Sequence, residues 1–94
     1  MPKYSVLHIN HDGDDLIIVP LPAGFGQSDE RQQRLLIGEL QKQAQAARMR
    51  GTIVPVWDDG SSRMAFAAPA KWHLFLHRLT LSKIRTMANR SIAW

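Results

Sequence analysis

The chain has 94 residues, no cysteine and a formal net charge of +4, and 45% of its residues are hydrophobic. This length predicts one domain spanning residues 1–94, and the hydrophobic fraction is too high for intrinsic disorder. Without cysteine, disulfides, thiolate zinc sites and thiol nucleophiles are excluded. No run approaches the roughly 18 apolar residues of a membrane span, and the start of the chain lacks the apolar region of a secretory signal. We therefore expect a cytoplasmic protein without membrane contact.

The first elements that the sequence predicts are two strands joined by a tight turn. Residues 4–9 are rich in β-forming side chains, and residues 16–19 are apolar at four consecutive positions. Asp12-Gly13 between them is a dipeptide typical of two-residue hairpin turns, because both residues tolerate positive φ. The unbroken apolar run of the second strand indicates that both of its faces are covered.

Residues 28–50 carry the one long helical periodicity of the chain. Apolar side chains recur there at spacings of four and three, at Leu36, Leu40, Ala44 and Ala47. Ser28 is predicted to cap the N-terminus with its hydroxyl. Asp29 and Glu30 place negative charge in the first turn, where the helix dipole favours it. Gly51 is predicted to end the helix in the left-handed conformation.

Two further strands are predicted after this helix, at residues 52–57 and 63–68. Pro55 has no backbone donor, so the third strand is expected to lie at an edge of the sheet or to be irregular. An edge strand rich in Val and Ile can pair with a second chain. The position of Pro55 therefore gives the first argument for a homodimer.

The last third of the chain predicts two short helices and an apolar end. Pro69 suits a first helical position, and either Thr80 or Ser82 can cap a second helix. Residues 91–94 then finish the chain, and the terminal Trp94 is expected to dock on the core. The order ββαββα predicts an α+β fold of two layers. In it, a four-stranded, mainly antiparallel sheet is covered by one long helix and a C-terminal helical segment on one face.

His8, His11 and Asp12 are the residues best able to hold a metal ion, because they cluster near the first turn. They do not match a calcium loop, and the two histidines lack the separation of the usual zinc half-sites. His73 and His77 would share a helix face, but no acidic residue lies near them in the sequence. We therefore expect no bound metal, and we interpret the second pair as the rim of an apolar patch.

Other catalytic and cofactor motifs do not fit. Gly24-Phe25-Gly26 precedes a helix, as phosphate loops do, but Asp29 stands where the dinucleotide pattern needs its third glycine. Asp29 and Glu30 would also repel a phosphate at that helix terminus. The serine-elbow motif is absent from the sequence as well. No catalytic residue or cofactor is predicted, although an enzyme stays open because catalytic residues need not be close in sequence.

The charges are unevenly distributed. Residues 1–60 carry six Lys/Arg against eight Asp/Glu, whereas residues 61–94 carry six Lys/Arg and no acid. This asymmetry indicates an anionic partner or an acidic surface on another subunit. The candidate partner-binding residues are the six cations and two tryptophans of this region: Arg63, Lys71, Trp72, Arg78, Lys83, Arg85, Arg90 and Trp94.

Two main functions follow from these observations. The sequence predicts a small non-catalytic binding or accessory domain that acts through protein contact and self-association, because an edge strand, tryptophans and unlike charged halves suit protein contact. The alternative is nucleic-acid binding by residues 63–94, whose cations would contact phosphates while the tryptophans stack on bases. An unrecognised small enzyme is the third option.

Overall fold

The computed structural model describes residues 3–60 and 63–93, and these form an α+β fold around one mixed sheet. Five strands run in the order β4-β3-β2-β1-β5. Their bounds are β1 (Lys3–His11), β2 (Asp14–Pro20), β3 (Thr52–Asp58), β4 (Met64–Phe66) and β5 (Arg90–Ala93). Neighbouring strands are antiparallel except β2 and β3, which run parallel. A parallel pair needs a crossover, and the turn η1 (Ala23–Gln27) and the helix α1 (Glu30–Ala46) supply it.

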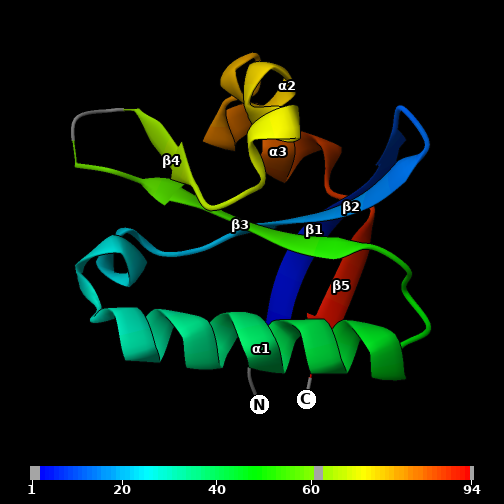
Figure 1. Cartoon of the computed structure of the whole chain (residues 1–94), viewed down its shortest axis with the longest axis horizontal. Coiled ribbons are helices and arrows are strands. Elements are labelled where there is room, and N and C mark those ends of the chain that lie inside the picture. Colours follow the sequence, from blue (N-terminus) through cyan, green and yellow to red (C-terminus); the bar gives the residue numbers. More distant parts are fainter. Residues whose placement is uncertain (1–2, 61–62, 94) are drawn as a thin grey trace.

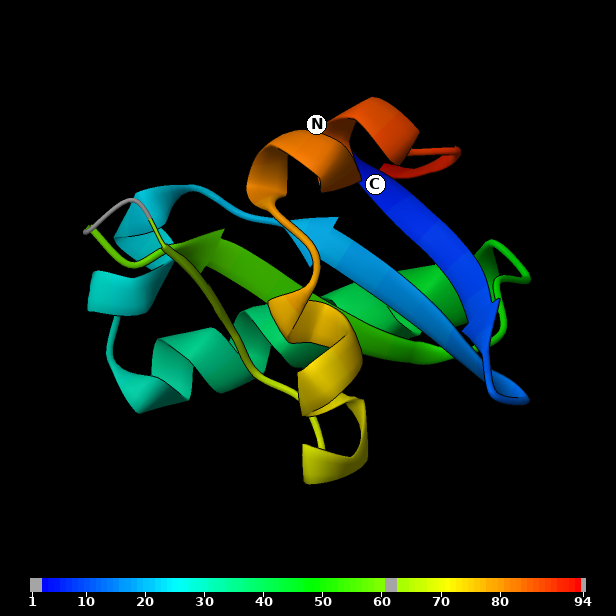
Figure 2. The same cartoon turned by 90° about the horizontal axis from the view of Figure 1, so that it is seen from above.

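Helices cover both faces of the sheet, so the fold has three layers where two were predicted (Figure 1). The helix α1 packs on one face over a core that contains Val6, Ile17 and Ile53. The opposite face carries η2 (Ala70–Trp72), α2 (His73–His77) and α3 (Leu81–Met87). In Figure 2, which looks down on this face, the short helices lie in front of the sheet and α1 lies behind it. Ile18 and Ile84 belong to the core on this second face.

The hairpin of β1 and β2 is confirmed, together with the covering of β2 on both sides. His11 pairs with Asp14 across a two-residue turn, in which Asp12 and Gly13 have φ values of 51° and 85°. All four residues of the apolar run 16–19 are fully buried. Because successive side chains of a strand point to opposite faces, this run required helices on both sides. The prediction of two layers is therefore wrong, because it placed all the helices on one face of the sheet.

The helix α1 is confirmed, but both of its predicted ends are wrong by a residue or more. Asp29, not Ser28, is the N-cap, and its Oδ1 accepts from the Gln32 backbone N–H at 2.8 Å. At the other end Arg48, with φ 60°, is the left-handed residue that ends the helix. The Met49 N–H then donates back to the Ala44 carbonyl at 2.9 Å, which is the Schellman arrangement.

The predicted edge position of the third strand is wrong, because β3 lies between β2 and β4. The Pro55 carbonyl accepts from the Ala67 N–H at 3.2 Å, so the proline's missing donor faces the β4 side. The β4 strand ends at Phe66, one residue before the position opposite Pro55. The proline therefore limits the length of β4 instead of marking an edge, and it leaves the pairing of β3 with β2 intact.

The C-terminal region contains two short helices, as predicted, and a strand that was not predicted. Thr80 is the cap of α3, and its Oγ1 accepts from the Lys83 N–H at 3.2 Å. After α3 the chain forms β5, in which Ile92 is buried opposite Tyr4 of β1. Trp94, which was expected to dock, lies outside the described residues. Within the described part of the chain, none of the helices has the length and apolar character needed to cross a membrane.

Candidate functional site

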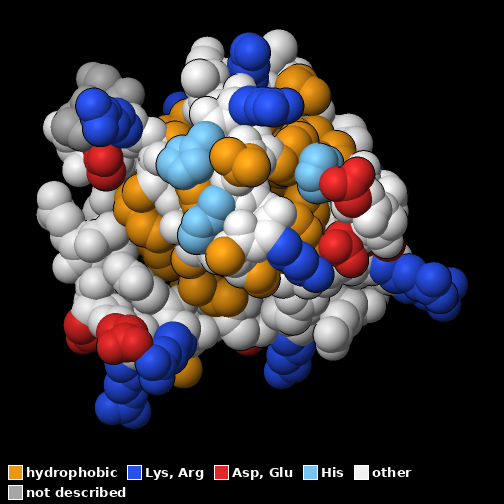
Figure 3. Space-filling model, turned by 45° about the horizontal axis from the view of Figure 1, so that its top comes forward, with side chains coloured by type: hydrophobic (Ala, Val, Ile, Leu, Met, Phe, Trp, Pro, Cys, Tyr) orange, Lys and Arg blue, Asp and Glu red, His pale blue; other side chains and the backbone are white. Residues whose placement is uncertain are grey.

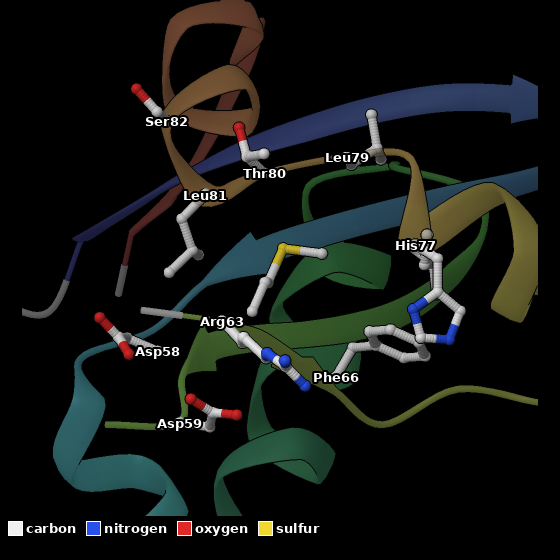
Figure 4. A pocket seen from close by; sticks show the side chains of 11 residues that line it. Asp58, Asp59, Arg63, Phe66, His77, Leu79, Thr80, Leu81 and Ser82 are labelled. Carbon is white, nitrogen blue, oxygen red and sulfur yellow. The ribbon is translucent and has the colours of Figure 1, made fainter. Parts of the chain in front are cut away.

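A pocket of about 700 Å³ lies between the β3–β4 turn and the α2–α3 connection. We call it the site pocket. Figure 4 shows Asp58, Asp59 and Arg63 on the side of the turn, with residues 79–82 on the opposite side. The two short helices do not reach over the end of β4, so this part of the sheet face stays open.

The floor of the site pocket is apolar and its rim is polar. Leu76 is fully buried, while the other apolar lining residues are half-buried: Met64, Phe66, Leu79 and Leu81. The polar lining residues are exposed, except for the half-buried Asp58. An apolar floor inside a polar rim is the usual anatomy of a protein-binding surface.

Phe66 is the central aromatic residue of this site. Its ring centroid lies 5.2 Å from that of His73 and 5.3 Å from that of His77, and both contacts are edge-on. The Nε2 atom of His73 is hydrogen-bonded to the Ala68 carbonyl at 2.8 Å. His77 is exposed and lines the pocket. The sequence interpretation of these two histidines as the rim of an apolar patch matches this arrangement.

The strand β4 is an edge of the described sheet, and its outer backbone groups have no partner among the described residues. The Asp59 N–H donates to the Arg63 carbonyl, and the Ala67 N–H donates to the Pro55 carbonyl. Because antiparallel pairs alternate, Ala65 also faces β3, and Met64 and Phe66 turn their N–H and C=O groups outward. Among the described residues, no other segment pairs with that side.

The six predicted cations are all exposed, but they do not converge on one surface. Only Arg63 lines the site pocket. Lys71 is held 3.3 Å from Asp14 and lies 4.8 Å from the centroid of the Trp72 ring. Figure 3 shows Lys and Arg side chains set apart around the edge of one face, whose centre holds hydrophobic and His side chains.

The two predicted tryptophans do not form a stacking surface in the described chain. Trp72 is only 5% exposed and belongs to the core under α2. Because its ring is already packed in the core, the structure gives no support to a partner-binding role for Trp72. Trp94 lies outside the described residues.

Of the three metal candidates near the first turn, His8 and His11 lie on opposite faces of β1, because they are an odd number of residues apart in a strand. The Nε2 atom of His11 lies 3.5 Å from Asp12 Oδ2, so only these two candidates come together. His8 Nε2 is hydrogen-bonded to the Arg50 carbonyl at 2.7 Å. The His11 ring stacks on Phe75 with the centroids 4.0 Å apart. Within residues 3–60 and 63–93, no three His, Asp or Glu residues gather as metal ligands.

The sequence reasoning missed the apolar floor as a site. In the sequence, the alternation of Met64, Phe66 and Ala68 indicates only that one face of this strand points inward. The spacing of Leu76, Leu79 and Leu81 indicates only the apolar side of the short helices. A usable signal was the shortness of the helices after Pro69, because two such helices cannot cover a sheet face as widely as α1 does.

The comparisons with known proteins add no relative. No family model, curated protein or solved structure matches the chain.

Proposed function

We propose that this chain is a small protein-binding domain, and that its partner strand pairs with the free edge of β4. Side chains of the partner would enter the site pocket beside Met64 and Phe66. The observation that carries this proposal is the coincidence of an unpaired strand edge with an apolar pocket on the same element. In such strand addition, backbone hydrogen bonds supply affinity and a pocket for alternate side chains supplies specificity.

The edge of β4 is suited to self-association. The sequence argument for a homodimer assigned the edge to the third strand, but β3 lies inside the sheet, so the proposal rests on β4 instead. An antiparallel pair of β4 strands centred on Ala65 would place Met64 opposite Phe66 of the second copy. Both residues turn their backbone groups outward, so four hydrogen bonds would form, and the small Ala65 side chains would meet at the twofold axis. A methionine facing an aromatic ring is a favourable contact. The other edge strand, β5, carries the exposed cation Arg90, and charge on an edge opposes pairing.

Sedimentation velocity tests self-association directly. At about 1 kcal/mol net for each hydrogen bond, together with the apolar contact, we expect dimers at tens of micromolar. Met64→Pro removes an outward donor and leaves the bonds between β4 and β3 in place, so it should give a monomer. A wild-type chain that stays monomeric at these concentrations would contradict the proposal.

Two further variants control for the fold. Met64→Ala keeps the backbone N–H and should retain most of the dimer, provided that the backbone pairing dominates. Met64→Lys keeps the N–H but puts a charge at the edge, so it should separate the copies as proline does. The melting temperature of each variant should equal that of the wild type, which shows that the fold is retained. A dimer that persists in both Met64→Pro and Met64→Lys would show that the two copies do not pair through β4.

Nucleic-acid binding by residues 63–94 is the second proposal carried over from the sequence. The separation of the cations and the burial of Trp72 give it less support than the protein-binding proposal. An Arg78→Ala variant tests it, since loss of a phosphate contact lowers affinity uniformly across sequences.

A cytoplasmic location likewise stays a prediction.

A further inference from the structure

A second groove, of about 560 Å³, lies between the start of β1 and the helix α3. It is lined by Lys3, Tyr4 and Ser5 of β1, by Arg85 of α3, and by the 20–22 segment that ends β2. Two of these residues are cations and none is acidic. We call it the basic groove, and we propose that it binds a phosphate-bearing anion.

The topology of the fold gathers positive charge at this groove. Residues 1–11 and 61–94 contain no acid, and the pairing of β1 with β5 brings these two stretches together. Asp14 and Asp15 begin β2, whereas the groove lies at its other end, about 20 Å away for six residues of strand. Asp58 lies at the end of β3, beyond β2, and it lines the site pocket instead.

The cationic side chains of the basic groove have no acidic partner among the described residues. In the described ranges 3–60 and 63–93, neither Lys3 nor Arg85 forms an ion pair. Both are exposed. By contrast, Lys71 is paired with Asp14. The basic groove therefore offers two charges that are available to a ligand.

The donors of the basic groove are held on regular elements. Lys3 and Ser5 are alternate residues of β1 and share one face, and their pairing with Ala93 and Ser91 fixes that strand. Arg85 follows Ile84, whose side chain is fully buried and anchors α3. The apolar wall is fixed as well, because the Leu21 N–H donates to the Val56 carbonyl at 2.8 Å.

The chemistry of this set suits a phosphate that is attached to a flat or apolar group. A guanidinium binds two phosphate oxygens at once, an ammonium adds a point charge, and a hydroxyl donates one hydrogen bond. The prolines of residues 20–22 would contact the remainder of the ligand, whereas the Tyr4 ring lies on the opposite face of β1 and packs against the core under α1. A free nucleotide and the backbone of a nucleic-acid strand both carry this chemistry.

Titration by amide NMR at low salt, with adenosine monophosphate and with a short oligothymidylate as the two probes, tests the proposal. We expect shifts confined to the amides of Lys3, Ser5, Leu21 and Arg85. Loss of one charge-assisted bond should make Arg85→Ala bind about tenfold more weakly. Comparable shifts with both probes identify a small phosphate ligand, and shifts with the oligonucleotide alone identify a nucleic-acid strand.

Lys83→Ala is the matched control, because Lys83 is an exposed cation of the same helix that does not line the groove. It should leave binding unchanged. If Lys83→Ala weakens binding as much as Arg85→Ala does, the attraction is diffuse and there is no site. The absence of shifts with both probes would also overturn the proposal. Neither result bears on the edge of β4, which Met64→Pro tests separately.

Discussion

Gly26, in the turn η1, lies directly against the indole of Trp57, which belongs to β3. A Cβ at this position would come within 2.5 Å of the Trp57 Nε1 atom. Phe25 packs against the same indole, with the ring centroids 4.9 Å apart. The absence of a side chain at residue 26 is therefore what allows Trp57 to close the core beside the start of α1.

Gly26→Ala should lower the free energy of unfolding by about 1–3 kcal/mol, the usual cost of overpacking. Gly24→Ala is the matched control, because it lies in the same turn and a Cβ there meets nothing within 4 Å. Thermal or urea unfolding gives both values. Equal effects of the two substitutions would mean that the indole does not press on residue 26.

The N-cap of α1 gives a second test at the scale of single residues. Asp29→Ala removes the acceptor for the Gln32 N–H and should cost about 1 kcal/mol of stability. The Ser28 hydroxyl instead donates to the Gly24 carbonyl at 3.3 Å, so Ser28→Ala should change stability by less than about 0.5 kcal/mol. Urea unfolding of the two variants distinguishes the two candidate caps. A larger loss of stability for Ser28→Ala than for Asp29→Ala would show that Ser28 is the N-cap.

At the scale of elements, Asn89 joins β5 to β1 through its side chain. Its Oδ1 accepts from the His8 N–H, and its Nδ2 donates to the His8 carbonyl, both at 2.9 Å. The backbone N–H of Asn89 donates to the Val6 carbonyl at 3.0 Å. The side chain thus extends the ladder of β1 beyond the first residue of β5.

Asn89→Ala should lower stability by about 1–2 kcal/mol, because it removes two hydrogen bonds at an exposed position. The amide of His8 should then exchange with solvent much faster than its neighbours in β1. Asn89→Asp keeps an acceptor for the His8 N–H and should preserve part of that protection. Unchanged exchange at His8 in Asn89→Ala would show that the contact does not hold the strands together.

The elements themselves were predictable to different degrees. Periodicity located α1 and the first hairpin, since 3.6-residue and turn signals are local. The strand β5 could not be read from its four residues, because Ile92 becomes a strand residue only by pairing with β1. The floor of the site pocket has no local pattern either, because it joins β4 to the α2–α3 connection. The shortness of the helices after Pro69 indicates only that part of the sheet face is left uncovered.

At the scale of the whole molecule, the two separate cores define the fold. Ile17 packs under α1 and Ile18 packs under α2 and α3, although the two residues are adjacent in β2. Both are fully buried. Such a pair is possible only in a sheet with helices on each face.

Ile17→Ala and Ile18→Ala should each cost about 2–5 kcal/mol of unfolding free energy, as expected for large-to-small changes in a core. A sheet with one face in water would instead make one of them nearly neutral. Urea unfolding measures the loss of unfolding free energy in each variant, and the two losses can be compared when the m-values are equal. One near-neutral result would contradict the three-layer arrangement.

The proposed binding role depends on the outer backbone groups of β4, which no other described segment pairs with. Hydrogen exchange at that edge is the most direct test of this role. The amides of Met64 and Phe66 should exchange quickly in dilute protein and become protected at high protein concentration, while Ala65 stays protected throughout. Fast exchange of Met64 and Phe66 at every concentration at which a dimer is present would contradict pairing through β4.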